Sequence, residues 1–505
     1  MAAHPASSTA RGWPPGGVAV PHANRYLVLL IAINLFNYID RQVLSAVLPR
    51  MQLDGTLFAP GDPNAQLKVG LLTSAFMAAY MVCSPIFGWL DGRRARRWII
   101  LGVGVTLWSI ASGASGLAQG YAMLLFTRCL VGVGEGAYGP VAAAMLADMY
   151  PDSKRGKVMA LFNMAIPVGS ALGFLIGAKI SGAFDDWRPA FLFTFSGLFL
   201  GLICFFQKES PRPPRTGGTN GPSYKAVLAG LKKNRSFVFC CAGMTAITFV
   251  IGGVAAWAPV YLFQREAKFA MTAEVVAKLS EAKPNGGDVP MLVAEKLRPL
   301  ADGHTRTYTE LRTEIATRLS EAESIQHAKA IYTLATTADS PKAEDLTIIL
   351  GAMIVLGGIS ATAVGAVLGE WLRPRVRGAY FRVIAAGAFF AIPSYLGLLY
   401  APLPWGWLCI FLCVFGLFLH TGPAFTILAN VTKSDERATA FAINILVIHL
   451  LGDAISPTLI GAVADLADLQ TAFAIMTAFI VVGGTLWLLG AKSLESDEKA
   501  VTEST

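Results

Sequence analysis

Twelve long apolar segments dominate this chain and decide what it can fold into. A helix needs about 20 apolar residues to cross the hydrocarbon core of a bilayer. The segments lie at about 25–49, 67–91, 97–117, 120–147, 156–180, 188–206, 236–263, 345–370, 379–400, 404–430, 438–462 and 470–491. Only 15% of the residues are charged, against about 25% in soluble domains. The sequence therefore predicts an all-α membrane protein with twelve transmembrane helices.

The polar stretches divide these segments into two groups of six. A Pro/Gly-containing linker at 208–235 separates a six-helix half at 25–207 from a second half at 236–491. Such pseudo-symmetric halves are typical of transporters built from internal repeats. Residues 1–24 are predicted to be a disordered cytoplasmic tail, and 492–505 a second cytoplasmic tail.

The second half contains an unusually long polar stretch at 265–344, which we predict to be an extracytoplasmic insertion. Apolar residues recur at helical spacing in 272–283 and 311–323. The insertion either caps one face of the bundle or acts in gating or substrate collection, and the sequence leaves both open.

Basic residues mark the side of the membrane on which each loop lies. Arg93, Arg94, Arg96 and Arg97 fall between spans two and three, whereas the alternate loops carry little basic charge. The positive-inside rule places these loops and both termini in the cytoplasm. No cleavable signal peptide is apparent, and we expect a multi-pass protein of the cell (inner) membrane, acting as a monomer.

Other partners are not indicated. The net charge of +8 follows the ends of the spans rather than one patch, so we expect no nucleic-acid partner. All seven cysteines lie in apolar segments without metal-type spacing. We therefore expect no metal, no disulfide framework and no cofactor.

Ionisable residues inside a span are costly and are first treated as functional. In span one, Asn37 and Arg41 share a helical face, and Asp40 lies three residues after Asn37. Asp40 and Arg41 are neighbours that diverge by about 100° around the helix. They form either a proton and substrate site, with Asp40 as the proton carrier, or a salt bridge that locks two helices.

Span four repeats this pattern with Arg128 and Glu135 two turns apart on one face. Glu135 is a second candidate for proton coupling, and Arg128 a candidate substrate contact. The alternative is a buried pair between the two that orients the span. Small residues that allow close helix approach also occur in spans four and five: Gly132, Gly134, Gly169, Gly173 and Gly177.

Span eleven carries His449 and Asp453 four residues apart, and therefore on one helical face. A histidine–carboxylate pair within the membrane is either a proton-responsive substrate contact or a polar contact that closes the extracytoplasmic gate.

The loop after span two, GWLDGRRARR, resembles the signature loop of the major facilitator superfamily. Gly88, Arg93, Arg96 and Arg97 match that pattern, but its acidic position holds Gly92, and Asp91 precedes it by one residue. Whether Asp91 replaces the displaced carboxylate at the inner gate is left open.

The segments NYIDRQVLSAVLP, GLLTSAFMAAYMV, RCLVGVGEGAYGP, FNMAIPVGSALG and IHLLGDAISPTLIG together resemble the Spinster family of lipid transporters within that superfamily. The resemblance implies a proton-linked carrier of amphipathic lipids such as lysophospholipids or sphingoid phosphates. It points to Asp40, Arg41, Arg128 and Glu135. It does not cover the insertion.

We therefore expect a secondary transporter that works by alternating access, not an enzyme. Its expected partners are a lipid or small-molecule substrate, protons and the bilayer. A carrier of small organic anions, with Arg41 as the carboxylate clamp, is the alternative. A lipid-modifying enzyme lacks support because the chain has no nucleophile elbow, metal triad or HExxH pattern. A sensor that uses the insertion as its receptor is a third class.

Overall fold

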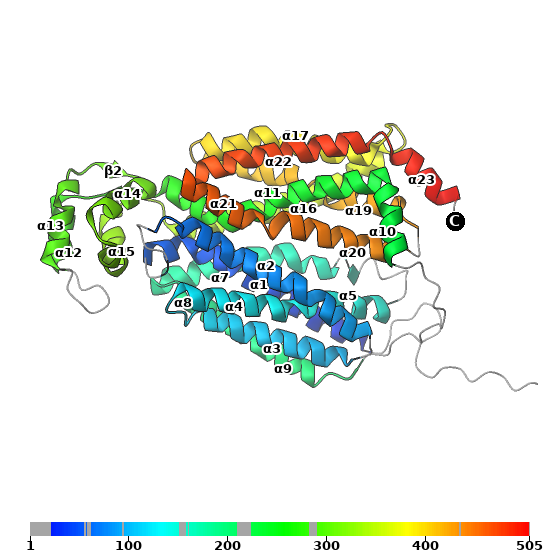
Figure 1. The fold of residues 1–505 in the computed structure, drawn as a ribbon, viewed down its shortest axis with the longest axis horizontal. Helices are drawn as coiled ribbons and strands as arrows, with labels where there is room; N and C mark the ends of the chain where they lie inside the picture. The colour runs from blue at the N-terminus through cyan, green and yellow to red at the C-terminus, as the bar shows by residue number, and fades with distance from the viewer. Residues whose placement is uncertain are drawn as a thin grey trace, which may run out of the picture.

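The computed structural model describes residues 22–54, 57, 62–92, 95–150, 158–159, 161–209, 224–281, 290–433 and 436–503. Twelve helices in this part of the chain are long and apolar enough to cross a membrane. They form two bundles of six that lie side by side (Figure 1). The predicted all-α fold with twelve spans in two halves is confirmed.

The first half is built from spans that are in part broken by turns. Its elements are α1 (Ala23–Asp54), α2 (Ala65–Gly92), α3 (Arg97–Ser115), α4 (Tyr121–Gly136), α5 (Tyr138–Met149), α7 (Ala165–Phe184), α8 (Arg188–Thr194), the 3-10 turn η1 (Phe195–Gly197) and α9 (Leu198–Phe205). The fourth span joins α4 to α5, and the sixth joins α8, η1 and α9.

The second half follows a short helix, α10 (Tyr224–Lys233), that lies within the linker. Its elements are α11 (Arg235–Glu266), α16 (Ala343–Leu372), α17 (Ala379–Tyr400), α18 (Trp405–Phe418), α19 (Thr421–Asn430), α20 (Arg437–Ile448), the π-helical turn η4 (His449–Asp453), α21 (Ser456–Leu466) and α22 (Leu469–Gly490). A last helix, α23 (Leu494–Glu503), occupies most of the C-terminal tail.

The insertion between α11 and α16 folds into a small unit of its own. It contains α12 (Ala273–Glu281), α13 (Met291–Leu297), η3 (Arg298–Leu300), α14 (Tyr308–Arg318) and α15 (Glu321–Ala335). The strands β1 (Phe269–Ala270) and β2 (Thr305–Arg306) pair antiparallel at its base. The rings of Phe269, Tyr308 and Tyr332 meet in its buried core.

Two boundaries differ from those read in the sequence. The pattern at 311–323 is not one helix, because Ser320 caps a new helix through a capping box with Glu323. The N-terminal tail was predicted to reach residue 24, but α1 begins at Ala23. The rest of that tail lies outside the described residues.

The insertion gives the bundle two distinguishable ends. We call the end that carries α12–α15 the insertion end and the opposite end, with α10 and α23, the linker end (Figure 1). The halves meet where α2 packs against α21 and α7 packs against α16.

Polar contacts join the two halves towards the insertion end. Arg50 of α1 binds both Asp185, which follows α7, and Glu344 at the start of α16. The carboxylate of Asp465 accepts from the backbone N–H groups of Gln66 at 3.0 Å and Leu67 at 2.7 Å. The contacts of Arg50 with Glu344 and of Asp465 with Gln66 and Leu67 tie the two halves together at the insertion end.

Candidate functional site

The central feature of the first half is an ion pair between α1 and α4. Arg41 donates from Nε to Oε2 of Glu135 across 2.7 Å. The Glu135 side chain is fully buried, whereas 18% of the Arg41 side chain is exposed. An interaction of this kind is a charge-assisted hydrogen bond, and burial strengthens it. It links two residues that are 94 positions apart in the chain.

Three aromatic rings surround the guanidinium of Arg41. Its Cζ lies 5.1 Å from the ring centres of Tyr38 and Tyr80, and 5.3 Å from that of Phe76. Ring faces attract a cation at distances within about 6 Å. The rings therefore help to stabilise the positive charge of Arg41 within the bundle.

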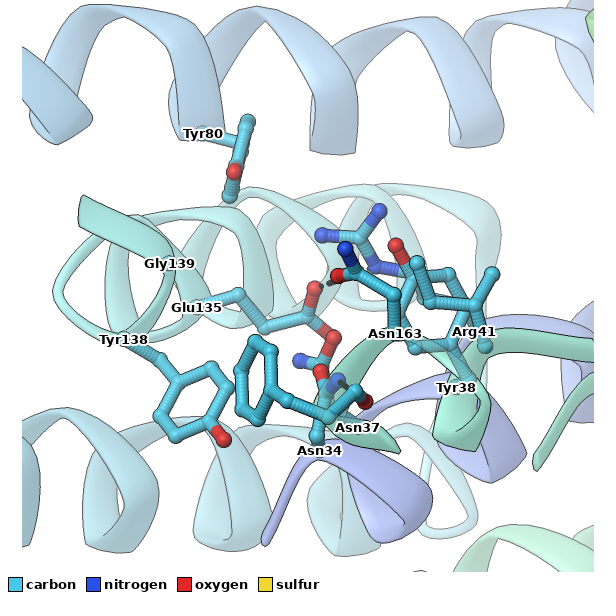
Figure 2. A pocket seen from close by; sticks show the side chains of 11 residues that line it. Asn34, Asn37, Tyr38, Arg41, Tyr80, Glu135, Tyr138, Gly139 and Asn163 are labelled. Atoms are coloured by element: carbon cyan, nitrogen blue, oxygen red, sulfur yellow. Dashed lines mark hydrogen bonds and ion pairs between the residues drawn. The ribbon is translucent and has the colours of Figure 1, made fainter. Parts of the chain in front are cut away.

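The pair faces a cavity of about 110 Å³ within the first half (Figure 2). The cavity is lined by Asn34, Asn37, Tyr38, Arg41, Tyr80, Glu135, Tyr138, Gly139, Phe162, Asn163 and Ile166. Figure 2 shows Asn37 and Asn163 beside the ion pair. The space suits several water molecules, each of which needs two to four polar partners.

Two polar atoms beside the cavity form no well-aligned hydrogen bond among the described residues, although the Asn37 amide interacts with the Glu135 carboxylate. They are Oε1 of Glu135 and Nδ2 of Asn37, both buried. Buried polar atoms nearly always have a partner, so a small shift of either side chain, or a water molecule in the cavity, would complete these hydrogen bonds. Asn34, in contrast, is satisfied, because its Nδ2 donates to the backbone oxygen of Phe162 at 3.0 Å.

Asp40 belongs to a second, separate cluster. It is 1% exposed and accepts a hydrogen bond from Ser112 of α3, while its Oδ2 has no partner among the described residues. Ser112 Oγ also accepts from Thr194 at 2.8 Å and from Nη2 of Arg128 at 3.4 Å. Ser112 therefore stands between the carboxylate of Asp40 and the cation of Arg128.

This arrangement differs from the pairing that spacing within span four suggested. Arg128 and Glu135 share a helix face, but Glu135 binds Arg41, and Arg128 turns to Ser112 and the ring of Phe191. The alternative of an Arg128–Glu135 pair is therefore wrong. Each residue has a partner on another helix, at a distance that helix packing sets.

His449 and Asp453 lie together at the interface of the two halves. His449 Nδ1 is 2.9 Å from Oδ2 of Asp453, and both residues belong to the π-helical turn η4. That turn packs against α2 of the first half and α11 of the second. Turns of this kind occur frequently at functional sites.

The motif after α2 forms a charged cluster at the linker end. Arg97 donates from Nε and Nη2 to the two oxygens of Asp91, at 2.6 and 3.0 Å. Its Nη1 reaches Asp148 at the end of α5 across 2.7 Å. Asp91 thus supplies a carboxylate next to the motif position that Gly92 occupies. Arg96 is exposed, and Arg93 lies outside the described residues.

The glycines singled out in the sequence lie where helices approach closely. A Cβ at Gly132 would overlap the backbone oxygen of Phe76 on α2, and one at Gly134 would lie 2.7 Å from the oxygen of Gly104 on α3. Gly169, Gly173 and Gly177 face α1 in the same way. The motif glycine Gly88, in contrast, has open space around it.

Sequence reasoning missed Ser112, Thr194 and Asp148. Serine and threonine are common in apolar helices, so their presence in spans three and six carried no signal. Asp148 is one residue beyond the end predicted for span four. A search for acidic residues at span ends could have found it.

Comparison with known proteins places this arrangement in a family. The sequence model of the protein family described as Major Facilitator Superfamily matches residues 30–278. Protein spinster homolog 3 of Danio rerio is 30% identical over 500 residues, which cover 94% of this chain and 86% of the relative. This chain belongs to the Spinster family of the major facilitator superfamily.

Other members and folds agree. The Spinster relative protein spinster homolog 1 of Homo sapiens is 30% identical over 455 residues, covering 87% of this chain and 72% of the relative. A bacterial homologue of the human lysosomal transporter Spinster, inward-facing and unoccupied, matches with a TM-score of 0.70 at 17% identity, covering 95% of this chain and 99% of that one. The xylose transporter XylE from E. coli, in an inward open conformation, gives 0.58 at 14% identity, covering 92% and 95%. These two likenesses show the fold.

Proposed function

We propose that this Spinster-family transporter is a proton-coupled secondary carrier that moves an amphipathic anionic lipid by alternating access. The lysophospholipid or sphingoid phosphate class follows from the family resemblance. The single observation that supports proton coupling is the buried pair of Arg41 and Glu135 beside a polar cavity.

The pair offers a direct way to couple the two ligands. Nε of Arg41 is occupied by Glu135, and the other two guanidinium nitrogens of Arg41, which lines the cavity, are proposed to receive an anion. When Glu135 takes up a proton, its attraction for Arg41 falls, and Arg41 is released to the anionic head group. Proton and anion then bind to the same state, which is the condition for carrying both in one direction.

In this proposal Asp40 has a different part. Protonation of Asp40 changes what Ser112 can accept and donate, and through Ser112 it changes the support of Arg128. Asp40 then links the charge state of α1 to the packing of α3 and α4. His449 and Asp453, with Asn37 and Arg128, are proposed substrate contacts.

The linker end is proposed to be cytoplasmic, with both termini there and the insertion outside. The closed insertion end would then make this an inward-facing state. Arg96, Arg97 and Asp91 would lie at the inner gate together with Gly88 and Arg93. We propose the cell (inner) membrane as the location and a monomer as the working unit.

One observation favours a second candidate, a carrier of small organic anions. The cavity of about 110 Å³ places Arg41 beside polar side chains that include Asn37 and Asn163, a setting that suits a small carboxylate. Arg41 would then clamp a carboxylate.

A transport panel separates the two. Liposomes that contain the purified protein are offered labelled lysophospholipid, sphingoid phosphate or short carboxylates, with Glu135→Gln as the matched variant. Proton-linked uptake of a lipid by the natural protein, with the proton dependence lost in Glu135→Gln, supports the first candidate. Uptake of short carboxylates alone supports the second. Uptake unaffected by a proton gradient, or a proton dependence unchanged in Glu135→Gln, contradicts the coupling.

A further inference from the structure

The insertion is covalently part of the second half but touches the first. It leaves the bundle after α11 and returns at α16, so it must move with the second half. At the point where the insertion begins, Arg265 of α11 donates to the backbone oxygen of Leu398 of α17 and so fixes the end of α11 within the second half. Yet α15 of the insertion packs against α1, and Leu53 of α1 contacts the insertion core.

Lys329 of α15 extends the polar network that closes the insertion end. Its Nζ lies 2.7 Å from the backbone oxygen of Asp185 and 3.5 Å from Oδ2 of the same residue. The carboxylate of Asp185 also binds Arg50, which binds Glu344. Lys329 of the insertion therefore shares the partner Asp185 with Arg50, and Arg50 forms the ion pair that crosses between the two halves to Glu344.

Arg312 of α14 makes a second contact with the first half. Its Nη2 donates to the backbone oxygen of Asp62 at 3.1 Å, directly before α2. The carboxylate of Asp62 in turn binds Lys68 at 2.6 Å and the N–H of Asn64 at 3.0 Å. The two contacts are on different helices of the insertion and reach opposite ends of the first half in sequence, near the start of α2 and the end of α7.

We propose that the surface of the insertion around Arg312 and Lys329 is a latch whose partner is the first half of the same chain. It holds the insertion end closed and must release before that end opens. The latch requires only that the halves separate at the insertion end during transport. It does not depend on the substrate or on proton coupling. The insertion therefore biases the resting protein towards the state seen here.

The strength of the contacts made by Lys329 and Arg312 determines how far they shift the population towards the state in which the insertion end is closed. Lys329 and Asp185 are both partly exposed to solvent, and such contacts are individually weak. Loss of both should change the population of the closed state by about two- to tenfold, enough to alter a transport cycle without unfolding the protein.

Hydrogen exchange on the full chain in nanodiscs, without substrate, tests the latch. The double variant Arg312→Gln/Lys329→Gln is compared with the natural protein and with Lys278→Gln, which changes an exposed lysine on α12 paired with Glu274. Exchange at the insertion-end segments of α1, α2 and α7 should rise about two- to tenfold in the double variant. It should not rise in Lys278→Gln.

Equal exchange at those segments in all three proteins would overturn the latch. Exchange in the core of α14 and α15 shows whether the insertion itself stays folded. If exchange in that core also rises in the double variant, the single variants Arg312→Gln and Lys329→Gln are measured. Each should show a smaller rise in exchange at the insertion-end segments of α1, α2 and α7 while the core of α14 and α15 stays protected. No rise at those segments in either single variant would overturn the proposal. Because no substrate is present, the result is independent of what the protein carries.

Discussion

Arg41 of α1 and Glu135 of α4 form an ion pair of 2.7 Å within the membrane part of the first half. Arg41 also attracts Asp40, its neighbour on α1, but its ion pair crosses to α4 beside a cavity lined by polar side chains that include Asn37 and Asn163. A buried pair of this kind is weak evidence for stability, since removing charges from water costs about as much as the attraction returns. Its position favours a functional reason for keeping it.

Replacing Arg41 by Gln should weaken binding of an anionic substrate. A hydrogen bond to a charged group contributes about 1.5–3 kcal/mol, and 1.4 kcal/mol corresponds to about tenfold in affinity. Titration of the purified variant should therefore show a dissociation constant raised about ten- to hundredfold. Lys278→Gln, on the insertion, should bind as the natural protein does. Unchanged affinity in Arg41→Gln would exclude Arg41 as the anion clamp.

Replacing Gly132 by alanine should show whether close helix packing at this position outweighs the higher helix propensity of alanine. In Gly132→Ala the new Cβ meets the backbone oxygen of Phe76, which cannot turn aside. Overpacking of this kind costs about 1–3 kcal/mol. Gly88→Ala is the matched control, because its Cβ enters open space and alanine favours a helix by about 0.5–1 kcal/mol. Thermal unfolding should show a lower midpoint for Gly132→Ala only, and equal midpoints would refute the close α2–α4 contact.

Substitutions in the charged cluster at the linker end should differ in how much they lower the stability of the protein. Arg97→Leu leaves Asp91 and Asp148 without their shared cation, and breaking a buried pair costs about 3–5 kcal/mol. Asp148→Asn removes only one of the contacts and should cost less. Arg96→Leu alters an exposed neighbour and should be nearly neutral. Melting temperatures in detergent test this order, and a loss in Arg96→Leu as large as that in Arg97→Leu would contradict it.

The insertion should lose stability as the pH falls below about 6.5. His327 is 1% exposed, and burial lowers its pKa from the ordinary value, with Glu323 opposing in part. Its Nδ1 has no hydrogen-bond partner among the described residues. The unfolded state therefore takes up a proton at a higher pH than the folded state, so acid favours unfolding across the window between the two pKa values.

Exchange of α15 amides in the full chain at pH 7.5 and pH 5.5 measures this effect after correction for the intrinsic rate. Protection should fall at the lower pH in the natural protein and should change less in His327→Gln. The same fall in both proteins would assign the pH response to other groups.

The fold was predictable because hydrophobic length alone decides which segments cross a bilayer, and all twelve spans are present. The register of the charged motif was harder to interpret. In the structure both oxygens of Asp91 bind Arg97, although Asp91 stands one residue before the motif position.

Pairing between helices could not be predicted. Spacing places Arg128 and Glu135 on one face, but the rotation and tilt of α1 and α3 decide which partner each one meets. The π-helical turn at His449 likewise depends on how η4 packs against α2 and α11. Helical periodicity shows which residues share a face of one helix, but it contains no information on how that helix lies relative to its neighbours.

Proton flux in liposomes tests the central claim that Glu135 takes up a proton during transport and thereby releases Arg41. Vesicles that contain a pH-sensitive dye and either the natural protein or Glu135→Gln are given the substrate identified by the panel. The natural protein should acidify or alkalinise the lumen as substrate moves. With substrate at equal concentration on both sides of the membrane, Glu135→Gln should still exchange labelled for unlabelled substrate. Its proton flux should be reduced at least about tenfold, since an amide cannot take up the proton. Full proton flux in Glu135→Gln would contradict the account.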